Sequence, residues 1–302
     1  MFELLKKGDV IGVVAPSSAV DKDDLEPINN SVMLMEAAGF RVKFGENVFK
    51  NTLGYGATPK EKAEDINNMF ADREVKAIFC LSGGFNSNCV FDYLDYDIIA
   101  RNPKPICGFS DSTSLTNAIY SKTGVITFNG PTFKALTTWA TEYGYKEVMK
   151  RFVEGSLELG EKNDEYTTIR EGVAEGRLVG GNLSLINEMC IGNYSIDFQD
   201  KILFIEEFCL ETPPELVANY LYHMKQNGVF DKIKGIWVGN YDGSSSLEKI
   251  LLDVLQNDYN FPIVKSNNFG HTEKKTVIPI GGMAKIDTND EIKIKLIEKI
   301  MK

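Results

Sequence analysis

The stretch Lys104-Pro105-Ile106-Cys107-Gly108-Phe109-Ser110-Asp111-Ser112-Thr113-Ser114-Leu115 indicates how this chain folds. A short apolar run ends at Gly108, and small hydroxyl residues that open a helical pattern follow Ser110. This order predicts a strand, a sharp turn and a helix, the geometry of a nucleophile elbow that presents a serine Oγ at a helix N-terminus. The elbow consensus is G-x-S-x-G, and Ser112 occupies its last position. The interpretation of Ser110 as a simple helix cap therefore stays open beside the elbow.

Apolar runs without alternation precede this stretch, and helical patterns separate them. Residues 10–15 and 75–81 have the composition of strands that are covered on both faces. They end in Pro16-Ser17-Ser18 and Ser82-Gly83-Gly84, at the strand ends where open α/β sheets bind ligands. The alternation of strands and helices predicts an α/β fold whose N-terminal domain, residues 1–140, is a doubly wound, mainly parallel sheet.

The second part of the chain has a less regular pattern. Residues 141–175 are polar and acidic, which predicts a connector between domains. Residues 176–302 predict a smaller α/β domain, in which a buried strand at 202–205 delivers Glu206 and Glu207 at its end. Residues 283–286 and 291–296 predict a hairpin.

Composition and charge restrict the class of protein. A net charge of −10 over 302 residues argues against nucleic acid as a partner. No apolar stretch is long enough to span a membrane, and the run at 10–15 is too short for a signal peptide, so we expect a cytoplasmic protein. The five cysteines are dispersed and contain no CxxC pair, which predicts reduced thiols. With two distant histidines, the sequence predicts neither a metal site nor a cofactor.

A serine nucleophile needs a base, and the chain offers His223 and His271. His223 lies in a helical pattern, which is typical of a structural histidine, whereas His271 follows Gly270 in a loop, a commoner setting for a catalytic imidazole. The base also needs an orienting carboxylate. Glu206 directly follows a buried strand, which favours it over Glu207, although both could be ordinary strand-end charges.

Taken together, these motifs resemble the LD-carboxypeptidase family of serine peptidases (family S66), which includes the microcin C7 self-immunity proteins. The resemblance covers nearly the whole chain through the motifs Val14-Ala15-Pro16-Ser17-Ser18, Gly83-Gly84, Gly108-Phe109-Ser110-Asp111, Gly180-Gly181-Asn182-Leu183, Leu203-Phe204-Ile205-Glu206-Glu207 and Gly270-His271-Thr272.

The resemblance implies roles for individual residues and an overall arrangement. It implies Ser110 as nucleophile, His271 as general base and Glu206 as orienting carboxylate. The backbone N–H groups of Gly84 and Asp111 would form the oxyanion hole, in agreement with the elbow and the glycine turn. The C-terminal domain would be of the swivelling type, with the triad assembled across the interdomain cleft, and the chain would be a homodimer. The candidates for substrate binding are four small polar residues in or next to these motifs: Ser17, Asn86, Ser87 and Asn182.

The family contains two kinds of substrate. The first expectation is cleavage of an amide at an L,D junction, with release of the terminal D-alanine from a murein tetrapeptide. The alternative is an amidase that acts on aminoacyl or peptidyl nucleotides, because the loop Gly83-Gly84-Phe85-Asn86-Ser87-Asn88 looks like the immunity branch. Against it, Trp139 and Trp237 lie outside the late connector that carries base-stacking tryptophans in that branch, and Tyr166 is the remaining aromatic candidate there. A non-catalytic ligand-binding protein is the third possibility.

Overall fold

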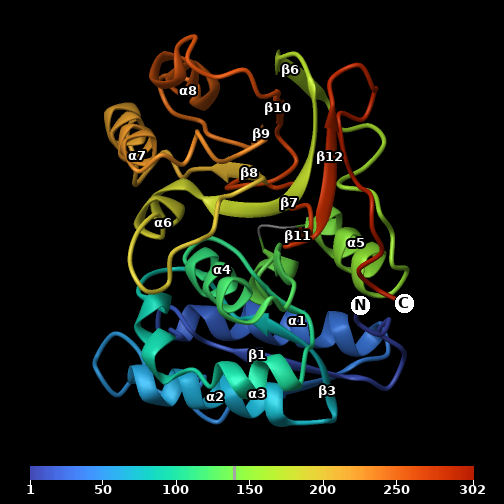
Figure 1. The fold of residues 1–302 in the computed structure, drawn as a ribbon. Coiled ribbons are helices and arrows are strands. Elements are labelled where there is room, and N and C mark those ends of the chain that lie inside the picture. The colour runs from blue at the N-terminus through green and yellow to red at the C-terminus, as the bar shows by residue number, and fades with distance from the viewer. Residues whose placement is uncertain (139–140) are drawn as a thin grey trace.

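The fold consists of two sheets, each with its own helices, in a computed structural model that describes residues 1–138 and 141–302 (Figure 1). The first sheet has the strand order β11-β5-β4-β3-β1-β2. Its strands pair in parallel except for β11, which runs antiparallel to β5. They are β1 (Val10–Val14), β2 (Arg41–Phe44), β3 (Val75–Cys80), β4 (Ile106–Gly108), β5 (Thr127–Asn129) and β11 (Ile278–Ile280).

The second sheet has the strand order β13-β12-β7-β8-β9-β10-β6. Its centre, β7 to β10, is parallel, and antiparallel strands flank it on both sides. The strands are β6 (Tyr166–Arg170), β7 (Val173–Asn182), β8 (Lys201–Glu206), β9 (Gly235–Val238), β10 (Ile263–Ser266), β12 (Met283–Asp287) and β13 (Ile294–Leu296).

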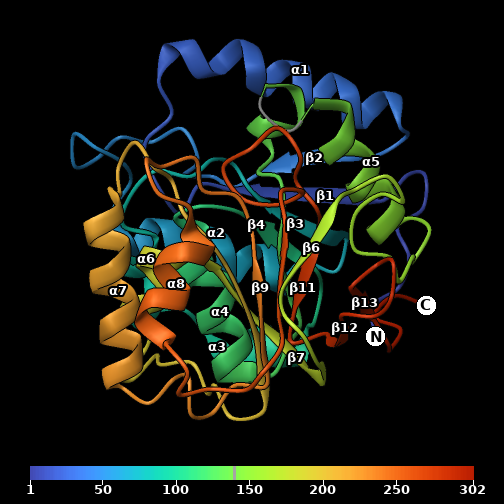
Figure 2. The same cartoon turned by 90° about the horizontal axis from the view of Figure 1, so that it is seen from above.

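Helices cover the two sheets in separate groups (Figure 2). Helices α1 and α5 lie on one side of the first sheet, and α2, α3 and α4 on the other, as a doubly wound fold requires. Helices α6, α7 and α8 pack side by side on the second sheet. The bounds are α1 (Leu25–Ala37), α2 (Pro59–Ala71), α3 (Tyr96–Arg101), α4 (Ser112–Thr123), α5 (Thr141–Phe152), α6 (Leu183–Glu188), α7 (Pro214–Gln226) and α8 (Leu247–Leu255), with 3-10 turns η1 (Lys22–Asp24), η2 (Ser87–Tyr93) and η3 (Lys134–Thr137).

Local sequence explains several of these boundaries. Helix α2 begins after Thr58, whose hydroxyl accepts from the Glu61 N–H, while the Glu61 carboxylate accepts from the Thr58 N–H. This reciprocal capping box satisfies two N–H groups that the helix start would otherwise leave unpaired. Gly39, with φ of 97°, follows the end of α1 in the left-handed conformation that commonly terminates helices. Residues within one turn of each helix end thus determine both boundaries.

Two strands extend the sheets beyond what the sequence pattern predicts. Strand β6 lies inside residues 141–175, which we expected to form a connector, and pairs with β10 at the edge of the second sheet. Strand β11 lies inside residues 176–302 and yet pairs with β5 of the first sheet. Neither pairing is visible locally, because each partner lies far away in the chain. The predicted α/β class, the parallel first sheet and the hairpin of β12 and β13 are confirmed.

Helix α4 joins the two halves where the site forms. The Asn117 side chain donates to the Gly180 carbonyl at 2.9 Å, and the Thr113 hydroxyl accepts from the Asn182 N–H at 3.2 Å. The end of β7 is thereby fixed against the helix that starts at the elbow. Across the described parts of the chain, no helix combines the length and apolar character needed to cross a bilayer.

Candidate active site

Ser110 stands at the apex of a strained turn between β4 and α4. Its φ is 58°, a left-handed conformation that costs a residue with a Cβ about 1–2 kcal/mol. A Cβ on Gly108 would lie 2.6 Å from the Ser112 Cβ and 2.9 Å from the Cys80 Sγ, so only glycine fits at this point of the turn. The strand, sharp turn and helix predicted from the sequence are therefore confirmed. Ser112 is fully buried against Gly108, so the turn forms without the last glycine of the consensus.

Ser110, His271 and Glu206 form a chain of hydrogen bonds across the two halves of the molecule. The His271 Nε2 lies 3.2 Å from the Ser110 Oγ, and the His271 Nδ1 lies 2.8 Å from the Glu206 Oε2. Glu206, at the end of β8, is fully buried, and its Oε2 also accepts from the His271 backbone N–H at 3.0 Å. A carboxylate facing Nδ1 assigns the ring proton to that nitrogen, which leaves Nε2 free to accept from the serine hydroxyl.

Two phenylalanines and a lysine confine the imidazole. The His271 ring stacks on Phe208 with centroids 4.6 Å apart, and Phe109 lies against it at the same distance in a tilted arrangement. The Lys275 Nζ donates to the carbonyls of Gly270 and Thr272, on either side of His271, and lies 4.1 Å from the Phe109 ring centroid. Burial lowers the pKa of Lys275 to about 8. The sequence does not indicate these contacts, beyond the position of each residue in or near a motif.

Two backbone N–H groups lie beside the serine. Asp111 follows Ser110 at the start of α4, and Gly84 follows Gly83, where a Cβ would lie 3.0 Å from the Ser110 Cβ. Within the described residues, the amides of Gly84 and Asp111 donate to no protein acceptor. Two N–H groups beside a nucleophile, one of them at a helix N-terminus, can stabilise a developing oxyanion.

The candidates Ser17, Asn86 and Ser87 support the loops beside the serine. Ser87 is fully buried; its Oγ donates to the Asp111 carbonyl at 2.7 Å, and its N–H donates to the Asp111 carboxylate at 2.8 Å. The Lys62 Nζ donates to the Ser17 carbonyl and to the Asn86 Oδ1, at 2.6 and 3.1 Å. These contacts link the loops after β1 and β3 to the elbow. Burial raises the pKa of Asp111 and lowers that of Lys62.

The fourth candidate, Asn182, lies between two buried carboxylates. Its Nδ2 donates to Glu207 at 2.8 Å and to Glu206 at 3.3 Å. Glu207 also accepts from the N–H groups of Ser184 and Phe208, and burial, followed by the nearby charge of Glu206, raises its pKa. The idea that both glutamates are ordinary strand-end charges is therefore wrong, since both are buried and hydrogen-bonded.

A cavity of about 670 Å³ opens beside the serine between the two halves. Its lining includes Gly84, Ser110 and Lys134 from the first half, and Phe208, His271 and Lys275 from the second. Ser17, Asn86, Ser87 and Asn182 are not among the lining residues. All four residues take part in hydrogen bonds within the protein, and their role in substrate binding stays a prediction.

The remaining features that the sequence singles out are His223, the two tryptophans, the five cysteines and the expected lack of a metal site. His223 on α7 bonds to the Asn187 side chain at 2.6 Å, in agreement with a structural histidine. Trp237 is buried in the core, whereas Trp139 lies outside the described residues. The described residues contain no group of three or more histidine, cysteine or acidic side chains that could hold a metal. The five cysteines are unpaired thiols, and burial raises the pKa of Cys80 to about 12.

A serine on a strained elbow, a histidine and a buried glutamate, shared by two α/β halves, define the class of serine hydrolases. Family models agree: the LD-carboxypeptidase N-terminal domain matches residues 11–130, and the LD-carboxypeptidase C-terminal domain matches residues 175–286. The chain belongs to this peptidase family.

Individual relatives align over almost the whole chain. A probable murein peptide carboxypeptidase of Bacillus subtilis is 33% identical, over 95% of this chain and 91% of that protein. The microcin C7 self-immunity protein MccF of Escherichia coli is 26% identical, over 95% and 93%. Among solved structures, an MccF-like protein from Bacillus anthracis aligns with a TM-score of 0.89 at 31% identity, over 98% of both chains. MccF in complex with aspartyl sulfamoyl adenosine aligns with a TM-score of 0.88 at 25% identity, over 100% of this chain and 99% of that one.

Proposed function

We propose that this chain is a serine carboxypeptidase that hydrolyses an amide at an L,D junction and releases the terminal D-alanine of a murein tetrapeptide. The observation that carries the proposal is the chain of hydrogen bonds from Glu206 through His271 to Ser110, with distances of 2.8 and 3.2 Å. A non-catalytic binding protein would not need this contact across two domains. The named activity of the Bacillus subtilis relative supports murein peptide as the substrate class.

In the proposed acylation step, the Ser110 Oγ attacks the scissile carbonyl carbon. The His271 Nε2 takes the hydroxyl proton, and the Glu206 carboxylate stabilises the resulting imidazolium through Nδ1. The carbonyl oxygen becomes negative and accepts from the N–H groups of Gly84 and Asp111. The oxyanion then collapses, the C–N bond breaks, and Nε2 returns the proton to the leaving amine of D-alanine.

In the proposed deacylation step, water replaces the amine. His271 accepts a proton from the water, whose oxygen attacks the acyl carbon, and the same two N–H groups hold the second oxyanion. Collapse breaks the bond between the acyl carbon and the Ser110 Oγ, the His271 Nε2 returns the proton to this Oγ, and the shortened peptide leaves. Phe109 and Phe208, which enclose the imidazole, restrict water around it and so strengthen its hydrogen bonds.

The test of this proposal is turnover of a murein tetrapeptide by the wild-type protein and by Ser110→Ala. The variant removes one oxygen from a residue at the cavity edge, so we expect an unchanged fold by circular dichroism and a loss of D-alanine release by at least about 10³-fold. Full activity of a folded Ser110→Ala protein would refute the mechanism.

The second candidate is an amidase for aminoacyl or peptidyl nucleotides, which the similarity to MccF favours. The surroundings of Tyr166 support the murein peptide instead. Its hydroxyl donates to the Leu159 carbonyl at 2.7 Å, and the ring does not line the cavity beside the serine. Turnover of an aminoacyl sulfamoyl adenosine, measured beside that of the tetrapeptide, separates the two: a higher kcat/KM for the nucleotide would replace the first candidate with the second.

The proposal extends to the cellular setting. A murein tetrapeptide as substrate corresponds to a role in peptidoglycan recycling in the cytoplasm. A homodimer is part of the same proposal, on the basis of the family resemblance. Fractionation of cells followed by immunodetection tests the location, and sedimentation of the purified protein tests the dimer. Recovery in the membrane or exported fraction, or a monomer at micromolar concentration, would contradict these two statements.

A further inference from the structure

The loop of residues 267–277, which carries His271, is closed at its base. The Thr276 N–H and hydroxyl both donate to the Asn268 carbonyl, at 2.9 Å each. Strand β10 precedes the loop in the second sheet, and β11 follows it in the first sheet. The loop that carries the imidazole therefore crosses from one half of the molecule to the other.

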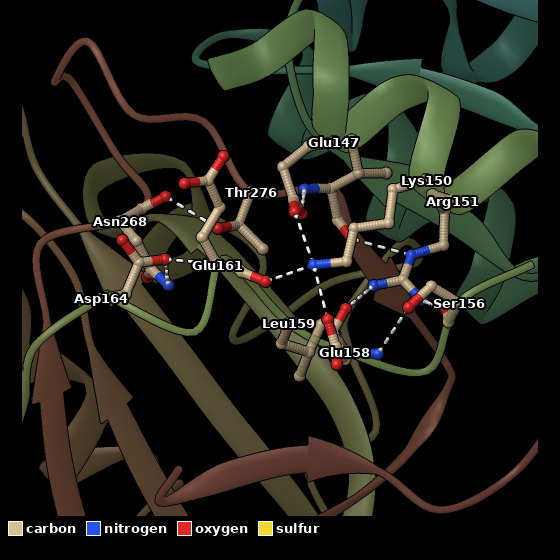
Figure 3. A network of polar contacts seen from close by, with 12 residues as sticks. Glu147, Lys150, Arg151, Ser156, Glu158, Leu159, Glu161, Asp164, Asn268 and Thr276 are labelled. Carbon is tan, nitrogen blue, oxygen red and sulfur yellow. Dashed lines mark hydrogen bonds and ion pairs between the residues drawn. The ribbon is translucent and has the colours of Figure 1, made fainter. Parts of the chain in front are cut away.

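Asp164, far from the serine in sequence, contacts this loop on both sides of His271. Figure 3 shows it beside Asn268. Its Oδ2 accepts from the Asn268 Nδ2 at 3.0 Å, and its Oδ1 accepts from the Lys274 Nζ at 2.7 Å. Its Oδ2 also accepts from the Tyr143 hydroxyl at 2.6 Å, and the Tyr143 oxygen lies 3.1 Å from the Thr276 Oγ1. One carboxylate thus connects residues before and after His271 to helix α5.

Helix α5 itself is fixed to the end of the loop and to the segment that carries Asp164 (Figure 3). The Glu147 carboxylate accepts from the Val277 N–H, and the Arg151 Nε donates to the Val277 carbonyl. Arg151 also donates to the carbonyls of Ser156 and Glu158. Arg151 is fully buried, so these bonds lie in a medium where losing a partner is costly.

We propose that Asp164 is a positioning residue, which holds His271 within hydrogen-bond reach of Ser110 by tying both sides of the His271 loop to helix α5. This inference rests on the proposed function, since it assigns to residues 141–175 the task of placing the general base. The side chain of Asp164 is 2% exposed. A small tilt of the loop would lengthen the 3.2 Å contact between Nε2 and Oγ, and misplacement of a reacting group by about 1 Å costs about 10²-fold in rate.

The charge of Asp164 is maintained by its partners. Burial acts to raise the pKa of Asp164, but the hydrogen bonds from Lys274, Tyr143 and Asn268 outweigh it, so this pKa lies below its ordinary value. The Asp164 carboxylate is therefore ionised at neutral pH. Asparagine at position 164 keeps the size of the side chain but replaces one acceptor oxygen with a donor that faces other donors.

The test compares Asp164→Asn and Asp164→Ala with Glu165→Gln, a matched control that removes the adjacent, exposed carboxylate charge. The probe is a fluorophosphonate: the Ser110 Oγ forms a bond to phosphorus, fluoride leaves, and His271 receives the hydroxyl proton. The second readout is the low-field NMR signal of the His271 Nδ1 proton that is shared with Glu206, measured without any substrate. Both are recorded well below the melting temperature of each variant.

We expect the phosphonylation rate to fall by about 10- to 100-fold in Asp164→Asn, with a broadened low-field signal, and to fall further in Asp164→Ala. Glu165→Gln should match the wild type in both readouts. Loss of stability alone changes neither readout in a folded protein, whereas loss of positioning changes both. A folded Asp164→Ala protein with the wild-type rate and signal would therefore overturn the proposal.

Should Asp164→Ala fail to fold, Lys274→Met decides the question, since it removes one tether at a half-exposed side chain. A reduced rate and a broadened signal support positioning, and wild-type values overturn it. Failure of the proposed function has a different signature. In that case the wild-type protein cleaves no tetrapeptide, while the NMR signal still responds to the substitutions at Asp164.

Discussion

Replacement of Glu206 by glutamine is the sharpest perturbation of the proposed mechanism. Glutamine has the same shape as glutamate, and its carbonyl oxygen can still accept from the His271 Nδ1, so the imidazole keeps its tautomer. Its amide must then replace Oε1, which accepts from the Asn182 Nδ2 at 3.3 Å, so that two donors face each other. Asn182 cannot rotate to relieve this contact, because the same Nδ2 donates to Glu207.

The size of the effect follows from the charge that is lost. During acylation His271 becomes a cation next to a fully buried carboxylate. Two unit charges about 4 Å apart attract each other by about 4 kcal/mol at an effective dielectric constant of about 20. Since about 1.36 kcal/mol changes a rate tenfold, Glu206→Gln should lower kcat by about 10³-fold. The assay is D-alanine release from murein tetrapeptide under saturating substrate.

Glu207→Gln is the matched control for this experiment. Glu207 is also buried, but its partners are Asn182, Ser184 and Phe208, and it makes no hydrogen bond to His271. Loss of a hydrogen bond to a charged group costs about 1.5–3 kcal/mol, so this variant should melt at a lower temperature and keep a kcat close to that of the wild type. If folded Glu206→Gln retains kcat within about tenfold of the wild type, the assignment of Glu206 as the partner of the imidazolium is refuted.

Two further perturbations address the oxyanion site and the buried lysine. Gly84→Ala should lower kcat by about 10²- to 10³-fold, because the new Cβ would lie 2.0 Å from the Ser18 Oγ, at a φ of 122°, and would displace the Gly84 N–H. The control is Gly54→Ala, which has a φ of 83° and open space around the new Cβ. Equal kcat values for the two variants would contradict the oxyanion role of Gly84. Lys275 has a pKa of about 8, against 10.5 ordinarily, so between these pH values the unfolded chain binds the proton more tightly and the free energy of unfolding rises with pH. Urea unfolding on either side of this window should show that Lys275→Met removes part of the rise, and an unchanged slope would contradict the low pKa.

The parts of the molecule that could be predicted from sequence are those determined by short-range geometry. The elbow depends on residues within a few positions of Ser110, and glycine at 108 is required by contacts with its own turn and the adjacent strand. Strand runs in a parallel sheet are continuous apolar segments, which explains why the pattern finds β1 and β3. The residue patterns favour His271 over His223 and Glu206 over Glu207, whereas the pairing of Glu206 with His271 is what the family resemblance implies.

The remaining features depend on contacts between distant segments. Ser87 is a candidate for substrate binding from the family motifs, and the sequence does not show that its hydroxyl donates to the Asp111 carbonyl. Nothing in the composition around Asp164 or Phe208 indicates that the first would reach Asn268 or that the second would stack on His271. Polar residues in motif loops divide between satisfying buried backbone and facing the cavity, and only the folded structure determines which of these each residue does.

The topology of the His271 loop has a consequence for how the site works. Ser110, the proposed nucleophile, follows β4 of the first sheet, and Glu206, the proposed orienting carboxylate, ends β8 of the second. His271, the proposed base, lies on a segment that leaves β10 of the second sheet and enters β11 of the first. His271 is thus connected to both halves at once, whereas Ser110 and Glu206 each belong to one. If a rotation between the halves changes the distance from Ser110 to Glu206, residues 267–277 must change conformation for His271 to keep both hydrogen bonds. The hydrogen bonds of Asn268, Lys274 and Lys275 limit how far that loop can move. The alignment of Ser110, His271 and Glu206 therefore depends on a fixed relative position of the two halves. The hydrogen bonds of Asn117 and Thr113, on the helix that follows the elbow, to the end of β7 maintain this relative position.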